Sequence, residues 1–162
     1  MQTDDLLTCL ANATVMQGLE RADLETLLRH ANMETASQGW MVLAEGQHSE
    51  GLYVVLSGQL KVMLLALDSR QHPNRVEDIH LSTLKPGDCF GDYSLIDAEP
   101  ASASVIAAEP SMLLKITRTE FEAAIADNDR LAKTIYRNLL RILVRRLRKK
   151  DQELDLNLDV LE

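Results

Sequence analysis

Six glycines, at positions 39, 46, 51, 58, 87 and 91, separate short apolar runs in the middle of the chain. The runs hold four to nine residues and are rich in β-branched and aromatic side chains, which favours strands over helices. We expect strands at 41–44, 52–56, 59–67, 76–84, 103–107 and 112–116. Short strands punctuated by turn residues predict an all-β core of the roll or sandwich type.

The segments that flank this β core have helical spacing. Thr117 and Glu120 have the spacing of a capping box in front of Phe121, so a helix is expected to begin at Thr117. The polar segment 68–75, which contains a proline, is expected to form an exposed hairpin loop. Two short helices are expected before about residue 32, because leucines recur there every three or four residues, at Leu6, Leu7, Leu10, Leu24, Leu27 and Leu28.

From about residue 129 the apolar residues again step by three and four, through Leu131, Ile135 and Leu139. This stripe predicts one long helix over 129–162 that follows a domain at 1–128. We expect its first two turns to pack on the chain's own core. Beyond Leu139 the helix is expected to outrun the domain, which favours a homodimer in which the helix residues Leu139, Leu143, Leu147 and Leu154 face the second copy.

Charge is segregated along the chain, whose net charge is −8. Residues 137–150 hold seven of the 17 lysines and arginines and no acid, while the last twelve residues hold five acids and no base. Residues 1–136 keep 10 basic and 20 acidic side chains, so this part of the chain repels a nucleic-acid duplex. No nucleic-acid partner is therefore expected for this chain alone, whereas the adjacent basic and acidic blocks favour a protein partner.

Several functional classes are excluded by missing patterns. No stretch approaches the roughly 20 apolar residues of a transmembrane helix, and the start of the chain is acidic where a signal peptide is basic, so a cytoplasmic protein is expected. Cys9 and Cys89 lack the spacing of a metal or redox pair, and the four histidines show no HxH or HxxxH pattern. We expect no metal, no cofactor and no catalytic residues, and hence no enzyme.

Local motifs then specify the fold. The stretches EG at 45–46, LYVVLSG at 52–58, LKPGDCFGD at 84–92 and ASV at 103–105 follow one another in this order. They resemble the turn and phosphate-cassette signatures of the cyclic-nucleotide-binding domain family, which includes catabolite-activator-type regulators and kinase regulatory subunits. The resemblance runs from about residue 19 to 147 and implies a mainly β fold with flanking helices, a jelly-roll-like double-stranded β-helix (β-roll) followed by a long C-terminal helix.

The same resemblance implies a ligand site. In the family, a short helix and an arginine hold the cyclic phosphate while a glutamate holds the ribose hydroxyl. Here Ala101 occupies the arginine position and Asp92 the glutamate position. Because no basic residue lies between Lys85 and Lys115, a replacement cation would have to come from Arg75, Arg137 or Arg141, and ordinary cAMP or cGMP binding is expected to be lost. Any ligand is expected to contact Gly91, Asp92, Tyr93, Ser102 and Ala103.

Three functions stay open at this point. The first is a regulatory interaction module whose degenerate cassette no longer binds cyclic nucleotides. The second is a sensor that binds a cyclic nucleotide in another way, or a less negatively charged molecule, and signals through the C-terminal helix. The third is a transcription regulator without its DNA-binding domain, because the sequence ends at Glu162 before a helix-turn-helix could follow.

Overall fold

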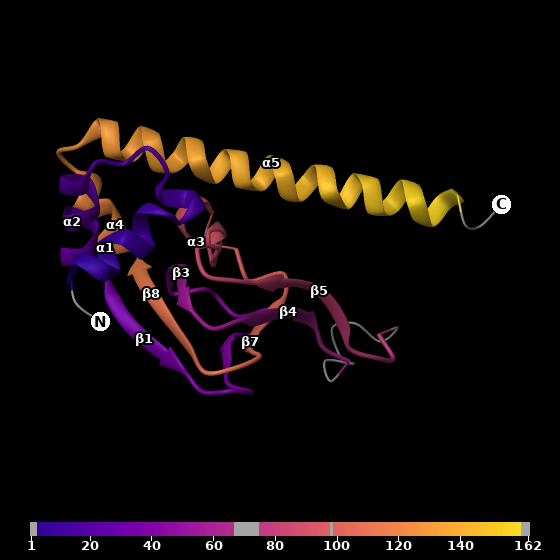
Figure 1. Cartoon of the computed structure of the whole chain (residues 1–162). Coiled ribbons are helices and arrows are strands. Elements are labelled where there is room, and N and C mark those ends of the chain that lie inside the picture. The colour runs from indigo at the N-terminus through magenta and orange to yellow at the C-terminus, as the bar shows by residue number, and fades with distance from the viewer. Residues whose placement is uncertain (1–2, 67–74, 98, 160–162) are drawn as a thin grey trace.

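Two antiparallel four-stranded sheets form a β-roll beside a long helix (Figure 1). The structure is a computed structural model that describes residues 3–66, 75–97 and 99–159, and the side chains of residues 4–66, 75–97 and 99–153. The strand order is β1-β8-β3-β6 in the first sheet and β2-β7-β4-β5 in the second. The strands are β1 (Asn32–Ala36), β2 (Met41–Leu43), β3 (Gly51–Ser57), β4 (Leu60–Leu64), β5 (Ile79–Leu84), β6 (Cys89–Phe90), β7 (Ser104–Ala107) and β8 (Ser111–Thr117).

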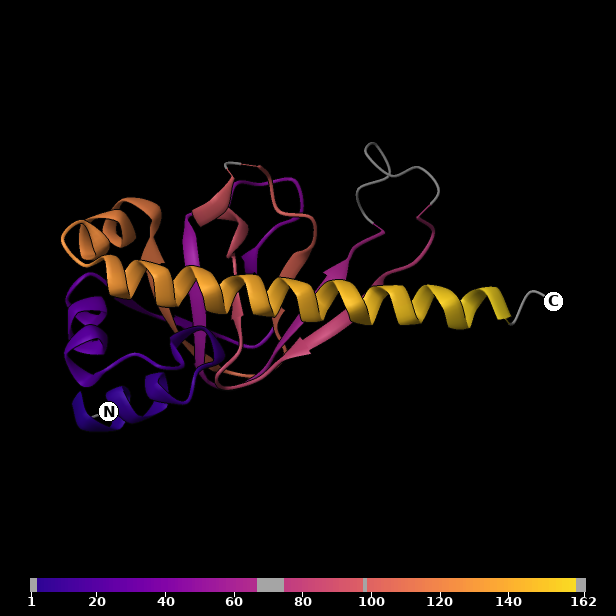
Figure 2. The same cartoon turned by 90° about the horizontal axis from the view of Figure 1, so that it is seen from above.

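Helices gather at one end of the roll and along one side. The helices α1, α2 and α4 lie at the end where the chain begins, and α5 runs along the side until its C-terminal end projects past the strands (Figures 1 and 2). The expected mainly β fold with flanking helices is confirmed. The helices are α1 (Thr3–Ala11), the 3-10 turn η1 (Thr14–Met16), α2 (Arg21–Arg29), α3 (Tyr93–Ile96), α4 (Arg118–Ile125) and α5 (Asp129–Asp159).

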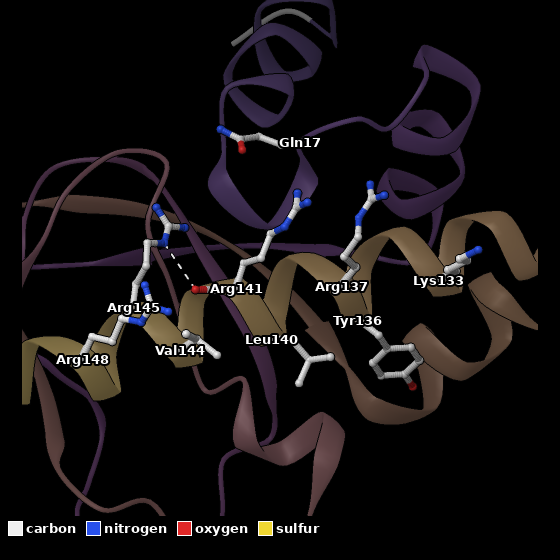
Figure 3. Close-up of a pocket in the computed structure, with 9 residues that line it drawn as sticks. All are labelled: Gln17, Lys133, Tyr136, Arg137, Leu140, Arg141, Val144, Arg145 and Arg148. Carbon is white, nitrogen blue, oxygen red and sulfur yellow. Dashed lines mark hydrogen bonds between the residues drawn. The ribbon is translucent and has the colours of Figure 1, made fainter.

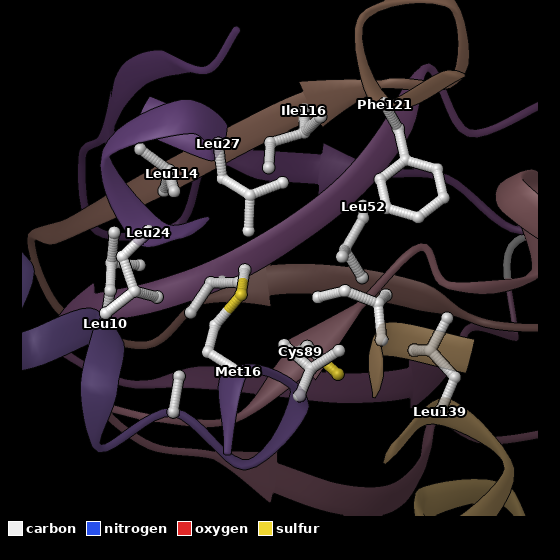
Figure 4. Packing of buried hydrophobic residues seen from close by; sticks show 14 of the residues in the cluster. Leu10, Met16, Leu24, Leu27, Leu52, Cys89, Leu114, Ile116, Phe121 and Leu139 are labelled. Atoms are coloured by element: carbon white, nitrogen blue, oxygen red, sulfur yellow. The ribbon is translucent and has the colours of Figure 1, made fainter. Parts of the chain in front are cut away.

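The apolar run of strand β3 is continuous because both faces of the strand are buried. Side chains of a strand alternate between the two faces of its sheet. Leu52 and Val54 join the cluster between the first sheet and the helices, while Tyr53 and Val55 join the cluster between the two sheets. Both faces of β3 are therefore covered, and Figure 4 shows Leu52 among the helix residues that cover one of them. Each fully buried side chain of this size contributes about 1.5–3 kcal/mol.

The strand predictions are correct in the centre of the sheets and fail at β1 and β6. Only Ala36 of β1 is buried, so this edge strand carries no apolar alternation and is held by its ladder to β8. Strand β6 spans two residues, fewer than a sequence pattern can show. The predicted strand at 76–84 begins only at Ile79, and Val76 is exposed. Of the predicted loop at 68–75, all but Arg75 lies outside the described residues.

The two N-terminal helices and the capped helix occur where they are predicted. At the start of α4 the backbone N–H of Glu120 donates to the hydroxyl of Thr117 at 3.2 Å, and the Glu120 carboxylate accepts from the backbone of Thr117 at 2.9 Å. This reciprocal pair satisfies two of the free N–H groups of the helix end. The hydrogen bond from the Thr117 backbone lowers the pKa of Glu120.

The long helix α5 is joined to the body more extensively than its sequence predicts. Leu131, Ile135 and Leu139 are fully buried in the core, and Ile142 is nearly so. The amide of Asn138 donates to the carbonyl oxygens of Val15, at 3.0 Å, and of Gln17, at 2.7 Å. Leu139 therefore belongs to the chain's own core rather than to a dimer contact, because η1 and the first sheet reach further along the helix than expected. The division of the chain at residue 128 stays a prediction.

Candidate functional site

A cavity of about 460 Å³ lies between the second sheet, the segment around α3 and helix α5. Ala101 and the five predicted ligand contacts line it together, although they come from segments on either side of α3. The opposite wall comes from α5, through Leu143, Arg146 and Leu147. The cavity is thus closed by the helix that the sequence assigned to dimerisation. The residues that line it from the predicted set are Gly91, Asp92, Tyr93, Ala101, Ser102 and Ala103.

Gly91 forms the turn that leads into α3 beside this cavity. Its φ is +70°, a conformation that side-chain-bearing residues rarely adopt. A Cβ atom at this position would lie 2.3 Å from the carbonyl oxygen of Gly51, so the close approach of the two backbones requires glycine. The Ser94 hydroxyl then donates to the Gly91 carbonyl at 2.6 Å and holds the first turn of α3.

Asp92 is buried, with 3% of its surface exposed, and its partner is Arg146 of α5. The Nη1 of Arg146 donates to both carboxylate oxygens of Asp92 at 3.0 Å, and its Nη2 donates to the carbonyl of Cys89 at 2.7 Å. Although partial burial opposes it, the Asp92 carboxylate raises the pKa of Arg146. A charge-assisted contact therefore ties the cassette to α5.

The replacement cations proposed from the sequence lie elsewhere. Arg75 is largely buried against Glu45, with N–O distances of 2.7 and 3.2 Å, and it does not line the cavity. Arg137 and Arg141 point from another face of α5. The arginine that reaches the cassette is Arg146, which the sequence did not single out. It stands 54 residues from Asp92, and nothing in its local sequence distinguishes it from its basic neighbours.

At the position where the resemblance implies an arginine, the chain has only the methyl group of Ala101. Its backbone is fixed on both sides, since its carbonyl accepts from Gly46 and its N–H donates to Gln47, each at 2.8 Å. The loop thus keeps a defined backbone while it offers no cation to a ligand. Most of the remaining wall is apolar and comes from Leu43, Val62, Leu81, Leu84, Phe90, Val105, Leu143 and Leu147.

A second surface lies on the outer side of α5. Tyr136 is 37% exposed, Val144 47% and Leu140 61%, at steps of four residues. In Figure 3 the side chains of Arg137 and Arg141 point toward the side on which Gln17 lies, and those of Tyr136 and Leu140 point away from it. Within the described residues, no ion pair involves the basic side chains that line this groove, Lys133, Arg137, Arg141, Arg145 and Arg148. We name this surface the outer α5 face.

The predicted dimer residues therefore divide among different environments. Leu139 is in the core, Leu143 and Leu147 line the cavity, and the side chain of Leu154 lies outside the described residues. Leu147 is also 61% exposed. The sequence could have indicated the outer face, because Tyr136, Leu140 and Val144 keep helical spacing one position after the core stripe.

Neither a membrane-spanning helix nor a metal-binding cluster is present in the described residues. Among the residues that the structure describes, no helix combines the length and the apolar character that crossing a membrane demands. No group of three or more His, Cys, Asp or Glu side chains in the described ranges is arranged to hold a metal ion.

Comparison with known proteins places these observations in a family. The sequence profile named cyclic nucleotide-binding domain matches residues 33–128. A CRP-like cAMP-activated global transcriptional regulator of Mycobacterium tuberculosis is 29% identical over 145 residues, which cover 90% of this chain and 60% of the regulator. The cyclic AMP receptor protein of Thermus thermophilus is 30% identical over 147 residues, which cover 91% of this chain and 63% of the receptor.

The solved structures agree with the sequence comparison. The crystal structure of Thermus thermophilus catabolite activator protein aligns with a TM-score of 0.73 at 30% identity, covering 89% of this chain and 62% of that one. The chain thus spans 60–63% of the length of these relatives. The profile match covers more than half of the sequence, and the β-roll and the turn at Gly91 are both present. The chain therefore belongs to the cyclic nucleotide-binding domain family.

Proposed function

We propose that the chain is a non-catalytic regulatory module, located in the cytoplasm, that does not bind cAMP or cGMP in the usual way and acts through helix α5. The observation that carries this proposal is Ala101, which brings no cation to the cavity where the family uses an arginine. A buried phosphate without a paired charge is poorly bound, because neutral groups recover only part of its lost hydration. Losing one such charge partner costs about 2–5 kcal/mol, or roughly a 30- to several-thousand-fold loss of affinity.

The contact between Arg146 and Asp92 supports an output through α5. It joins the cassette to the helix across the cavity, so a change at the cassette alters a contact that holds the helix. The outer α5 face then offers an apolar stripe for a second copy of the chain. We place the homodimer contact there, on Tyr136, Leu140 and Val144, because a monomer rarely leaves such a stripe uncovered.

The cavity itself favours a second function, that of a small-molecule sensor. Its volume of about 460 Å³ falls within the range of roughly 300–1,000 Å³ that is typical of ligand sites. A lapsed site has no need of this space, and core side chains would be expected to fill it. In this second function the occupant is not an ordinary cyclic nucleotide, and Leu143, Arg146 and Leu147 report its presence to the rest of α5.

Calorimetric titration with cAMP and cGMP tests the first proposal. We expect no measurable binding by the wild type at millimolar ligand, and binding by Ala101→Arg, which returns the cation to a loop with a fixed backbone. Ala101→Met is the matched control, because methionine adds similar length without charge. Micromolar binding by the wild type would contradict the proposal. If Ala101→Arg also fails to bind cAMP and cGMP while its far-UV circular dichroism spectrum is unchanged, the missing cation is not the reason why the wild type does not bind them.

A further inference from the structure

We propose that the cavity binds a ligand with no net charge, composed of an apolar body and hydroxyl groups at one end. This inference rests on the second function given above, in which the cavity still binds a small molecule. It follows from the charges, the free polar groups and the apolar walls of the cavity.

The charged side chains around the cavity are balanced in number between the two signs. Arg146 is engaged by Asp92 and the Cys89 carbonyl, and Lys149 lies 3.7 Å from Glu153. Of the other lining residues in the described ranges, Lys150 is basic and Glu99 is acidic. The lining thus carries three charges of each sign, and no surplus of positive charge awaits an anion.

Arg146 cannot bind an anionic ligand without breaking its ion pair with Asp92. The side chain of Asp92 is only 4% exposed, so removal of its partner would leave a buried carboxylate uncompensated. This penalty would lower the affinity for an anion by roughly a hundredfold or more. An uncharged ligand leaves the pair intact and avoids the penalty.

The uncharged polar groups of the cavity indicate hydroxyl chemistry in the ligand. The hydroxyl groups of Ser49 and Ser94 donate to the carbonyls of Gly51 and Gly91 and are already used. Those of Ser82 and Ser102 line the cavity, and within the described residues no hydrogen bond to another protein group is formed by either of them. A hydroxyl can serve as both donor and acceptor, so it suits a ligand hydroxyl in either role.

The apolar wall of the cavity indicates that the rest of the ligand is apolar. Phe90, Val105 and Leu143 face the cavity from three separate elements, and the side chain of Ala101 is a methyl group where the family has a guanidinium. Burial of apolar ligand surface against such walls provides binding energy without any charge.

A matched pair of fluorescent probes tests this inference. N-phenyl-1-naphthylamine is uncharged, and 8-anilino-1-naphthalenesulfonate carries one negative charge on the same ring system. Titrations in about 1 M salt, where the Debye length is about 3 Å, suppress the effect of the chain's overall negative charge. We expect the wild type to bind the uncharged probe at least about tenfold more tightly. Ala101→Arg should shift this ratio toward the anion by at least about tenfold, and Ala101→Met should not.

Two further variants locate the probe. Val62→Trp on β4 and Ala103→Trp just before β7 fill the cavity from different segments and should abolish the signal. Met33→Ser is the control, because Met33 is exposed on β1 and lies outside both the cavity and the outer α5 face, and it should leave the signal unchanged. Equal ratios in the Arg and Met variants, no binding of the uncharged probe, or a signal that survives in both tryptophan variants would each overturn the inference. The last three results leave the interaction module standing, whereas micromolar cAMP binding by the wild type would overturn both proposals.

Discussion

Removing the guanidinium of Arg146 is the most direct test of the contact between the cassette and α5. Arg146→Met keeps much of the aliphatic length of the side chain and deletes its three hydrogen bonds, two to Asp92 and one to the Cys89 carbonyl. Asp92 is then left as a buried carboxylate with no neutralising partner, since it is 3% exposed. The substitution should destabilise the fold mainly through this stranded charge.

The expected magnitude follows from the burial of the two partners. Breaking a fully buried pair from one side costs about 3–5 kcal/mol. The Arg146 side chain is 38% exposed and the Asp92 side chain 4%, so solvent weakens the contact on one side only. We therefore expect a loss of about 2–3 kcal/mol. The additional change Asp92→Asn removes the stranded charge, and the double variant should recover at least about 1 kcal/mol of this loss.

Urea unfolding of the four proteins of this double-mutant cycle measures the effect. Arg148→Met is the matched control on the same helix, because its side chain is exposed, and it should change stability by less than about 0.5 kcal/mol. A coupling free energy below about 0.5 kcal/mol between positions 92 and 146 would refute the reasoning, because a contact that links cassette and helix must couple them.

Three further predictions address other parts of the chain. Leu140→Glu combined with Val144→Glu should convert a homodimer to a monomer in sedimentation equilibrium, whereas an unchanged mass would remove the outer α5 face as the interface. Burial raises the pKa of Cys89 to about 12, so iodoacetamide at about pH 8 should modify Cys9 and spare Cys89. Since the unfolded thiol ionises near pH 8.5, stability should also fall above about pH 9 by up to 1.4 kcal/mol per pH unit, and Cys89→Ala should make this slope shallower. Thr117→Ala should cost about 1 kcal/mol in chemical unfolding, and no loss would refute the capping box.

The sequence predicts the parts of the fold where local pattern and tertiary packing agree. Strand β3 has both faces buried and therefore reads as an uninterrupted apolar run, and the capping box of α4 is local in sequence. Strand β1 escapes notice because an edge strand with one buried side chain is stabilised by its hydrogen-bond ladder, which leaves no apolar pattern. Helix α5 is predicted as a helix, but how far the body covers it depends on where η1 lies.

The candidate site is likewise predictable from the sequence only in part. The motif around Gly91, with Ala101 where the resemblance implies an arginine, can be recognised in the sequence because it is contiguous. The role of Arg146 is not, because the contact with Asp92 spans 54 residues and exists only once α5 has packed along the roll. Seven basic residues lie in 137–150, and their sequence does not distinguish the one that turns inward from those that form the outer row.

Helix α5 carries different surfaces on different sides: the core stripe through Leu139, the cavity wall through Arg146 and the outer stripe through Leu140. When a rigid helix moves relative to the groups that contact one of these surfaces, it also moves relative to the groups that contact the other two. If occupancy of the cavity shifts the helix, thermodynamic reciprocity requires the outer stripe to change its affinity for a second copy by the same factor that assembly changes the affinity for the ligand. Ligand affinity would then depend on protein concentration, so one helix would report how much of its own protein is present as well as what fills its cavity.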